Sequence, residues 1–492
     1  MREGVLVKPY ERLEKAQIEK IHEASLSILR DPGIISYNRE AAEIFADNGA
    51  EISSNNGYWR ISIPEGLIEE SVKHAPSVVK LGAREKENSL ILDGKESRVR
   101  FGTGSEANVI LDMDVEDFVS ERTGIKRSFP VFQRRRGTVK DLCKAAHLCE
   151  LLENVDFFLR NVNIQDDDIT DDNKDVNKFY ASLNNTTKHV MAGLTNLEKL
   201  DDVIRMAELV SGGRKEPIIS FIACVTKSPL QFIKESTQNL IEMTRRNYPV
   251  VISVSPQGGS TAPIQEAGMV AQQNAEILAG VVLSQLVREG APVLYGSNPL
   301  RVRMDNLDNM YGAPETNQYY IGGVQMARFY GIPCYSAAGV GDSKFPGIEA
   351  TAEKMMSHLF SSLSGAQYVH YAFGLLEGTN TLSFEQLILD DLHVGFCKSM
   401  LRGQRIEEEL RDSLEEIREV MGTSHKMFTR YARKYMRAGE VIPFYPFDGD
   451  ANETLIKARE RKGDLLAAPV EEIPEDIKRG IFQEFDVLER IR

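Results

Sequence analysis

Three segments of the chain hold most of the polar residues that could do chemistry, together with flexible glycines. They are Ser255–Pro263, Ala338–Pro346 and Tyr368–Gly378. Within them, Asp342, His370 and Glu377 have side chains that can exchange a proton or balance a charge near neutral pH. We therefore expect Asp342, His370 and Glu377 to be the catalytic residues.

Aromatic residues are concentrated in the same half of the chain. An electron-rich ring attracts a cation by about 0.5–2 kcal/mol, so rings beside a carboxylate can hold a quaternary ammonium group. Most rings in such a set belong to the core, and the rings alone therefore indicate only a cationic ligand. The expected substrate-binding residues are Phe101, Gln257, Tyr295, Tyr335, Phe345 and Tyr371.

Other kinds of catalytic motif are missing from the sequence. It has no Ser/His/Asp nucleophile elbow, no HxH pair and no phosphate loop. The segment Phe101–Glu106 has only the first two glycines of a dinucleotide motif. Cys143 and His147 lie one helical turn apart, but Cys149 falls on another face, so we expect core packing and no metal site.

One sequence pattern repeats from residue 99 onward: a short apolar run, a small-residue or polar turn, and an amphipathic helix. The runs are continuously apolar, as expected of strands that are buried on both faces. They are Val99–Thr103, Val155–Ile164, His189–Leu194, Pro217–Val225, Val250–Ser255, Pro292–Gly296, Pro333–Gly339 and Ala366–Phe373. Eight such units over about three hundred residues predict an α/β protein, a TIM (β/α)₈ barrel with its site at the carboxyl ends of the strands.

A doubly wound sheet is the structural rival, but it would usually show a glycine-rich phosphate turn after its first strand. The segments on either side of the barrel follow a different pattern. We expect residues 1–98 to form an N-terminal α+β extension packed on the barrel, 99–403 the barrel, and 404–492 a helical C-terminal tail. The aromatic–proline cluster Ile442–Phe447 in that tail suggests packing on the barrel or on a second subunit, and hence a homo-oligomer.

The composition narrows the classes of partner. The formal net charge of −14 argues against nucleic acid or an anionic membrane, because phosphate binding needs a basic face. No run of about 18 apolar residues occurs, and charged residues stand where a signal peptide would need an apolar region. The five scattered cysteines suit a reducing compartment. We therefore expect a cytoplasmic protein.

Four stretches of the chain resemble the trimethylamine and glycine betaine methyltransferase family, corrinoid-dependent proteins that demethylate methylated amines. The resemblance covers nearly the whole chain, and the motifs stand in the same order and at similar spacing. They are Asn184–Lys188; Pro256–Pro263 with Gln272–Glu276; Gly339–Pro346; and His370–Gly378 with Ser383–Gln386 and Asp390–Asp391.

The resemblance implies a TIM barrel that moves a methyl group from an amine to the cobalt of a separate corrinoid protein. The corrinoid (cobalamin) cofactor would arrive with that partner, and the chain would hold no tightly bound cofactor of its own. Trimethylamine-specific members carry pyrrolysine, whose imine engages an amine lone pair, whereas this sequence has only the standard residues. Its absence favours a quaternary amine, with glycine betaine first, followed by proline betaine, carnitine and butyrobetaine.

Two alternatives remain open at this stage. The first is another barrel enzyme, a lyase or hydrolase that uses Asp342, Lys344 and His370 as acid and base and works without corrinoid. The second is a non-catalytic betaine-binding subunit of a methyl-transfer complex. The density of polar groups at the strand ends disfavours this second alternative.

Overall fold

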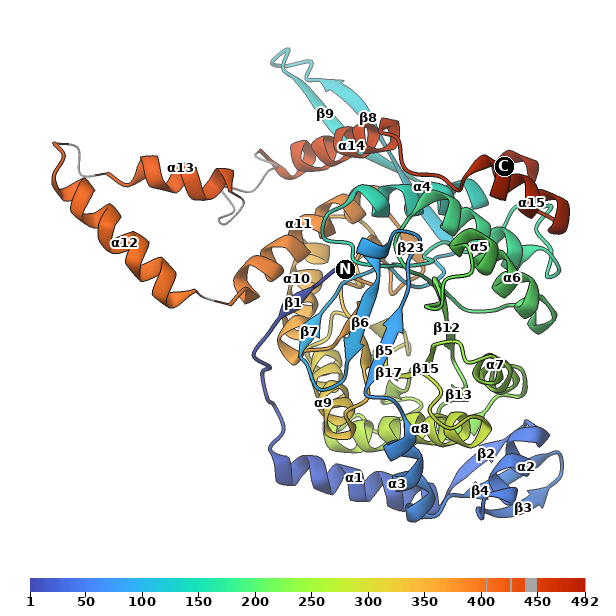
Figure 1. The fold of residues 1–492 in the computed structure, drawn as a ribbon. Coiled ribbons are helices and arrows are strands. Elements are labelled where there is room, and N and C mark those ends of the chain that lie inside the picture. Colours follow the sequence, from blue (N-terminus) through green and yellow to red (C-terminus); the bar gives the residue numbers. More distant parts are fainter. Residues whose placement is uncertain (404, 425–426, 439–448, 492) are drawn as a thin grey trace.

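A parallel barrel forms the centre of the molecule (Figure 1). The computed structural model describes residues 1–403, 405–424, 427–438 and 449–491. Seven strands pair side by side in one parallel sheet. In order they are β10 (Phe158–Leu159), β11 (Val190–Ala192), β12 (Ile219–Ala223), β15 (Val250–Val254), β17 (Val293–Ser297), β20 (Cys334–Ala337) and β21 (Tyr368–His370).

The gap between β21 and β10 is filled by Phe101 and Gly102. Phe101 bridges Val369 and Gly102 bridges Phe157, both in the parallel sense. These two residues occupy the place of the eighth strand, and the predicted TIM-like barrel is confirmed. The preceding residues Arg98–Val99 (β7) pair instead with Val5–Leu6 (β1), so the first predicted run is shorter as a barrel strand than its sequence suggests.

Helices surround the barrel. They are α4 (Val139–Leu151), α5 (Lys174–Asn185), α6 (Leu200–Ser211), α7 (Lys234–Arg245), α8 (Glu266–Val287), α9 (Pro314–Tyr330), α10 (Ile348–Ser364) and α11 (Phe384–Leu401). Helix α8 is buried along most of its length, because α1 (Lys15–Arg30) and α3 (Glu65–His74) of the N-terminal segment pack on its outer side. Its apolar residues therefore run around the whole helix instead of along one face.

A hairpin from the N-terminal segment closes the bottom of the barrel. Its strands are β5 (Val78–Leu81) and β6 (Leu90–Asp93). Their apolar side chains share one buried cluster with the inward residues of the barrel strands, among them Leu159, Met191 and Leu294. The amino-terminal end of the barrel is thus filled with packed side chains.

The rest of the N-terminal segment forms a small sheet against the barrel. Strands β2 (Ile34–Ser36), β4 (Tyr58–Ser62) and β3 (Glu51–Asn55) are joined by β14 (Gln231–Phe232) and β13 (Thr226–Lys227), which follow barrel strand β12. Helix α2 (Arg39–Asp47) covers this sheet. Backbone pairing therefore fixes the N-terminal segment to the loop after β12.

A long β-hairpin rises directly after the first barrel position and was not predicted. It consists of β8 (Val109–Val119) and β9 (Lys126–Arg136), which pair along their whole length. The short strands β22 (Leu375–Leu376) and β23 (Thr381–Leu382), from the loop after β21, extend its base. Two further short strands, β16 (Gln257–Gly258) and β18 (Leu300–Val302), pair with each other above the barrel, and β19 (Asn309–Met310) joins them.

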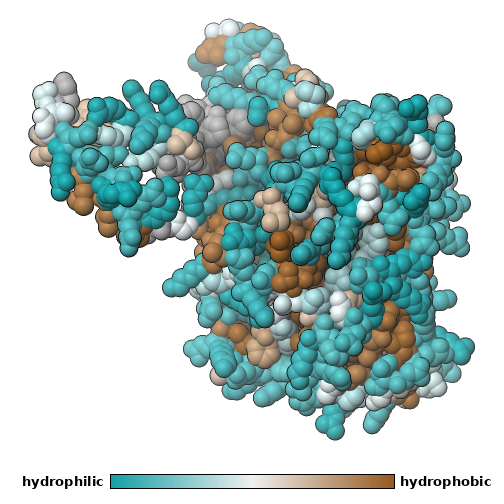
Figure 2. Space-filling view, viewed as in Figure 1, coloured by the Kyte–Doolittle hydropathy of each residue, from teal (hydrophilic) through white to brown (hydrophobic). Residues whose placement is uncertain are grey.

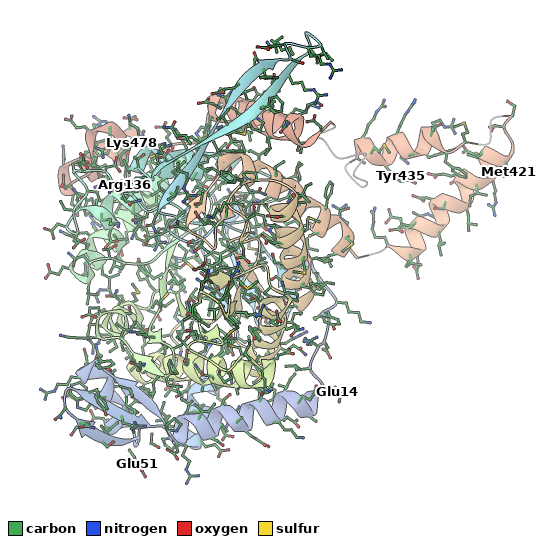
Figure 3. The ribbon with its side chains drawn as sticks, turned by 180° about the vertical axis from the view of Figure 1, so that it is seen from behind. Glu14, Glu51, Arg136, Met421, Tyr435 and Lys478 are labelled. Atoms are coloured by element: carbon green, nitrogen blue, oxygen red, sulfur yellow. The ribbon has the colours of Figure 1, made fainter. Side chains whose placement is uncertain are left out.

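The C-terminal helices divide into an arm and a part that returns to the barrel. Helices α12 (Ile406–Met421) and α13 (Thr429–Arg437) project away from the body, as the labelled Met421 and Tyr435 show in Figure 3. Exposed apolar residues lie along this arm, with Leu410 58% and Leu414 53% exposed, and Figure 2 shows apolar atoms at its edge. Helix α14 (Ala451–Ala467) packs on α11 and α4, and α15 (Glu475–Glu484) packs on α6.

The aromatic–proline cluster Ile442–Phe447 lies outside the described residues, and the homo-oligomer stays a prediction. None of the helices that the structure describes is both long and apolar enough to cross a membrane.

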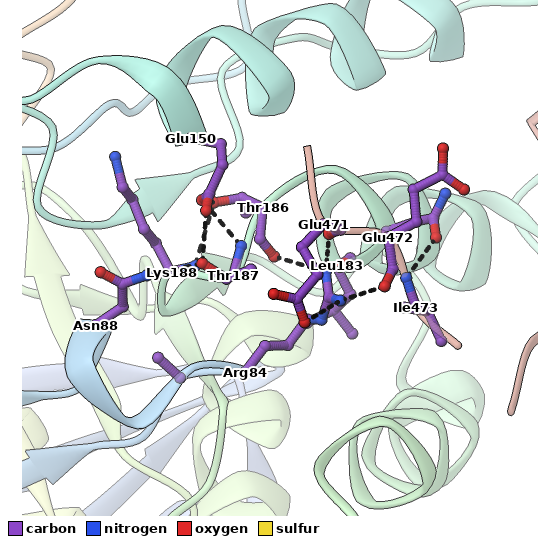
Figure 4. A network of polar contacts seen from close by, with 12 residues as sticks. Arg84, Asn88, Glu150, Leu183, Thr186, Thr187, Lys188, Glu471, Glu472 and Ile473 are labelled. Atoms are coloured by element: carbon purple, nitrogen blue, oxygen red, sulfur yellow. Dashed lines mark hydrogen bonds and ion pairs between the residues drawn. The ribbon is translucent and has the colours of Figure 1, made fainter. Parts of the chain in front are cut away.

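The Asn184–Lys188 stretch fastens three distant segments together (Figure 4). The Glu150 carboxylate accepts hydrogen bonds from Thr186 Oγ1 (2.7 Å) and Thr187 Oγ1 (2.6 Å), and the Asn184 amide oxygen accepts one from the Ile473 backbone (3.1 Å). The Arg84 guanidinium donates to the carbonyl of Leu183 (2.9 Å) and to the carbonyl of Glu472 (2.7 Å). Buried polar groups are normally satisfied by internal hydrogen bonds of this kind. We therefore assign a structural role to this motif.

Candidate active site at the barrel mouth

Five aromatic rings form a column inside the barrel that ends at its mouth, the carboxyl ends of the strands. Phe157 stacks on Tyr368 with ring centres 3.5 Å apart, and Tyr368 lies 5.8 Å from Tyr335. Tyr335 stacks on His370 at 3.9 Å, and Tyr371 lies edge-on to His370 at 3.7 Å. We call these five residues the aromatic column. Its upper end presents electron-rich rings toward the mouth.

The imidazole of His370 is neutral in this setting. The side chain is fully buried, and burial lowers its pKa well below the usual value. Neither ring nitrogen has a hydrogen-bond partner among the described residues. The amide of Asn161, just beyond β10, is also buried with no partner for either of its polar atoms within the described chain. Unsatisfied buried polar atoms cost free energy, so their presence in one region indicates a place for a ligand or for water.

Charged residues lie beside the aromatic column. Arg160 Nε lies 2.6 Å from a carboxylate oxygen of Glu106, and Arg160 Nη1 donates to the Ser105 carbonyl (3.1 Å). Lys178, which is fully buried, pairs with Asp175 at 2.6 Å and lies 3.9 Å from Glu106. Burial opposes ionisation of Glu106, but the charges of Arg160 and Lys178 outweigh it and lower the pKa of this carboxyl. The group is therefore ionised and balanced.

Three further polar side chains complete the mouth. The Cys224 thiol, just after β12, is reached by solvent although the surrounding barrel wall raises its pKa. The Asn298 amide donates to Ser255 Oγ (3.1 Å) and to the Tyr371 hydroxyl (3.3 Å). Cys224, Ser255 and Asn298 follow three neighbouring strands, as expected for a site at this end of a barrel.

The backbone at the mouth is strained at two places. Ser105 and Tyr371, which follow the first and last strand positions, adopt φ values of 72° and 66°. A non-glycine residue in this left-handed region costs of order 1–3 kcal/mol, and such residues cluster at functional sites. In Ser105 the unusual conformation accompanies the hydrogen bond that its carbonyl oxygen accepts from Arg160.

The sequence-predicted residues fall into three groups. Tyr335, His370 and Tyr371 come together in the aromatic column. Phe101 and Tyr295 point outward, toward the helices: Phe101 lies against His358 and Lys398, and the Tyr295 hydroxyl donates to Asn274 on α8 (2.9 Å).

The other four predicted residues lie in the loops above the barrel. The Glu377 carboxylate pairs with Arg134 at the base of the β8–β9 hairpin (2.6 Å), and Gln257 donates to Asn309 (3.0 Å). Phe345 is 47% exposed and packs its ring near Phe132. The Asp342 carboxylate accepts hydrogen bonds from the backbone amides of Tyr311 and Gly312 (both 2.8 Å), which holds two loops together.

The environment of Asp342 predicts a pH dependence of stability. Burial, with the neighbouring Glu353, raises the pKa of this carboxyl to about 6 against the pull of its two backbone amides. The folded protein therefore binds a proton here between about pH 4 and 6 where the unfolded chain does not, so this contribution to stability falls as the pH rises through that window. Relative to Asp342→Asn, the wild type should gain on the order of 1–2 kcal/mol in free energy of unfolding from pH 7 to pH 4.

Urea unfolding at the two pH values measures this difference. The matched control is Asp305→Asn, because Arg303 lowers the pKa of the exposed Asp305 to about 2 and its charge does not change in this range. A difference between wild type and Asp342→Asn that stays constant from pH 4 to 7 would contradict the raised pKa.

Comparison with known proteins identifies the family to which this chain belongs. The family model described as "Trimethylamine methyltransferase (MTTB)" matches residues 5–439, which is most of the chain. The chain belongs to this family.

Individual members of the trimethylamine methyltransferase family carry different substrate names. A trimethylamine methyltransferase of Desulfitobacterium hafniense (strain DSM 10664 / DCB-2) is 30% identical over 397 residues, 80% of this chain and 75% of that protein. One from Methanosarcina barkeri is 32% identical over 405 residues, covering 80% and 76%. A glycine betaine methyltransferase of Desulfitobacterium hafniense (strain Y51) is 28% identical over 436 residues, covering 88% and 85%. The family thus fixes the methyltransferase class, while the relatives differ in the amine.

Several mouth residues of this family member escaped the sequence prediction. They are Glu106, Arg160, Asn161, Cys224 and Asn298. Arg160, Asn161 and Cys224 fall inside the predicted apolar runs, whereas Glu106 and Asn298 follow the ends of their runs by three and two residues. The alternation of side chains along a strand could have indicated Asn161, because Phe157, Leu159 and Asn161 share one face of the strand and only Asn161 is polar.

Among the described residues, no group of three or more His, Cys, Asp or Glu side chains could hold a metal ion.

Proposed function

We propose that this protein transfers a methyl group from a quaternary amine, glycine betaine first, to the Co(I) of a corrinoid protein. The observation that carries the proposal is the upper end of the aromatic column, where Tyr335 stacks on His370 and Tyr371 packs against His370 just after the end of β21. A quaternary ammonium cannot donate a hydrogen bond, so it is recognised by aromatic faces and not by carboxylates alone. The standard residues throughout the sequence agree with an amine that offers no lone pair to an imine.

The chain's own residues would bind and orient the amine. The three rings would surround the ammonium, and the hydrogen bond from Asn298 to the Tyr371 hydroxyl would fix the uppermost ring. Because the product is a neutral tertiary amine, no residue has to protonate the leaving group. This suits a site whose histidine is held neutral by burial. Orientation in a water-poor opening would be the main catalytic contribution.

The mouth is also a suitable place for a group carried by a partner. The buried, unsatisfied amide of Asn161 and imidazole of His370 lie where a second molecule could complete the polar contacts. When bound, the reduced cobalt of the corrinoid would supply the nucleophile that accepts the methyl group. The chain would need no tightly held cofactor of its own.

The two alternative functions are less well supported. An acid–base lyase or hydrolase would need a histidine that can exchange protons. His370 is buried between two rings, and burial lowers its pKa well below the usual value. Asp342 is likewise engaged by two backbone amides. A non-catalytic binding subunit would share the aromatic column, so only a turnover measurement separates it from the enzyme.

Anaerobic visible spectroscopy of the protein with cob(I)alamin and candidate amines tests the proposal. We expect loss of the Co(I) absorption and growth of methylcobalamin with glycine betaine, but not with trimethylamine. Proline betaine, carnitine and butyrobetaine serve as the competing quaternary substrates. If free cob(I)alamin is silent, the reaction is repeated with the corrinoid protein from the same organism. Folded protein that forms no methylcobalamin in either format would end the methyltransferase proposal for these amines.

A further inference from the structure

We propose that Arg160 is the carboxylate-binding residue of the mouth, so that the site selects quaternary amines that carry a carboxylate. The inference rests on the proposed function, because it assigns the second end of the same substrate. The opposite end, the ammonium, is assigned to the aromatic column.

The guanidinium of Arg160 has donors left over after its internal contacts. Nη1 donates to the Ser105 carbonyl, and Nε lies near Glu106 without forming a directed hydrogen bond. Within the described chain, Nη2 makes no hydrogen bond. A guanidinium with two uncommitted N–H directions matches the two oxygens of a carboxylate, which lysine cannot do with one point charge.

The position of Arg160 relative to the aromatic column supports the same assignment. Its Nη1 binds the carbonyl of Ser105 (3.1 Å), and an added Cβ at the neighbouring Gly104 would stand 2.6 Å from the Tyr371 ring. Arg160 therefore borders the same opening as the upper rings. Nη2 also lies over Gly193, where an added Cβ would stand 3.1 Å from it. A side chain at residue 193 would crowd the guanidinium.

The local charges fit a zwitterion better than a simple cation. Glu106 and Asp175 balance Arg160 and Lys178, so these four groups together carry no net charge without a ligand. A neutral betaine keeps that balance: its ammonium meets the rings and its carboxylate meets Arg160. A quaternary amine without a carboxylate would leave an unbalanced positive charge near Arg160, which disfavours binding in an enclosed site.

Calorimetric binding without any corrinoid tests the assignment separately from turnover. Wild type should bind glycine betaine at least about tenfold more tightly than tetramethylammonium, which has the same cationic end. Arg160→Met should weaken glycine betaine binding about 10- to 100-fold and change tetramethylammonium binding less than about threefold. Arg303→Met, at an exposed arginine that pairs with Asp305, is the matched control and should bind both as wild type does.

Arg160→Met leaves Glu106 without its nearest cation, so the double variant Arg160→Met/Glu106→Gln provides a second test if the single variant does not fold. Wild type that binds both ligands equally, or an Arg160 variant that keeps full glycine betaine affinity, would overturn the inference. Selective loss of betaine binding without methyl transfer in wild type would sink the proposed function and leave the carboxylate site standing.

Discussion

Replacing Lys354 by Met is expected to lower the free energy of unfolding by roughly 3–5 kcal/mol. Lys354 Nζ lies 2.9 Å from Asp390, and both side chains are fully buried. Lys354 also donates to the Gly339 carbonyl, and the Asp390 carboxylate accepts a hydrogen bond from the Gly374 backbone (2.7 Å). The pair therefore joins α10 and α11 to the loops after β20 and β21. Burial disfavours the Asp390 charge, but Lys354, together with His393 and His358, outweighs it and lowers the pKa of Asp390 to about 2.

The large effect comes from leaving one charge buried without its partner. In Lys354→Met, Asp390 must either stay ionised in an apolar setting or take up a proton. Urea unfolding at pH 7 measures the loss, and Lys354→Met/Asp390→Leu should recover part of it. Arg39→Met is the matched control, because Arg39 pairs with Glu43 at 2.7 Å on the surface and is expected to cost less than about 1 kcal/mol. Equal losses for the two single variants would contradict this account.

Gly104→Ala is expected to reduce kcat/KM for the proposed methyl transfer by about 100-fold or more. A Cβ at this position would lie 2.6 Å from the Tyr371 ring and 3.1 Å from His370 Nδ1. The added methyl group must therefore displace the upper end of the aromatic column. A misplacement of about 1 Å in a site that works by orientation can cost 10²-fold in rate.

The matched control is Gly66→Ala, at an exposed glycine in α3 where an added Cβ meets nothing within 4 Å. It should leave activity unchanged and favour the helix slightly, by roughly 0.5–1 kcal/mol. The methylcobalamin assay gives the rates, and calorimetry shows whether glycine betaine binding falls in parallel. Full activity of folded Gly104→Ala would remove the aromatic column from the reaction.

The barrel could be predicted because its signal is local and repeated. Strands buried on both faces are continuously apolar, and each is followed by a helix, so seven of the eight predicted runs contain or overlap a strand of the seven-stranded barrel sheet. The first run is the exception, since Val99 pairs with Val5, a partner far away in the sequence. The position of the β5–β6 hairpin was missed for the same reason, because the barrel strands that it packs against lie far away in the sequence.

Because the barrel strands are continuously apolar, their sequences do not reveal which residues face the inside of the barrel. In a strand buried on both faces, residue type does not distinguish the two directions. Phe101 and Tyr295 point toward the helices, while their neighbours Gly102 and Gly296 lie on the inward side. Tyr335 and His370 share the inward side by the same alternation. Arg160 and Glu106 meet only because β10 and the first strand position are neighbours in space, which no local pattern reveals.

The filled bottom of the barrel has a consequence for the kinetics of the proposed reaction. Because the β5–β6 hairpin closes one end, small molecules exchange through the mouth, the same opening that the corrinoid partner would cover. The amine would have to enter first, and the demethylated product would leave only after the partner departs. Such a compulsory-order mechanism makes excess corrinoid protein an inhibitor that is competitive with the amine. A partner that dwells too long on the mouth would then limit turnover more than the chemistry does.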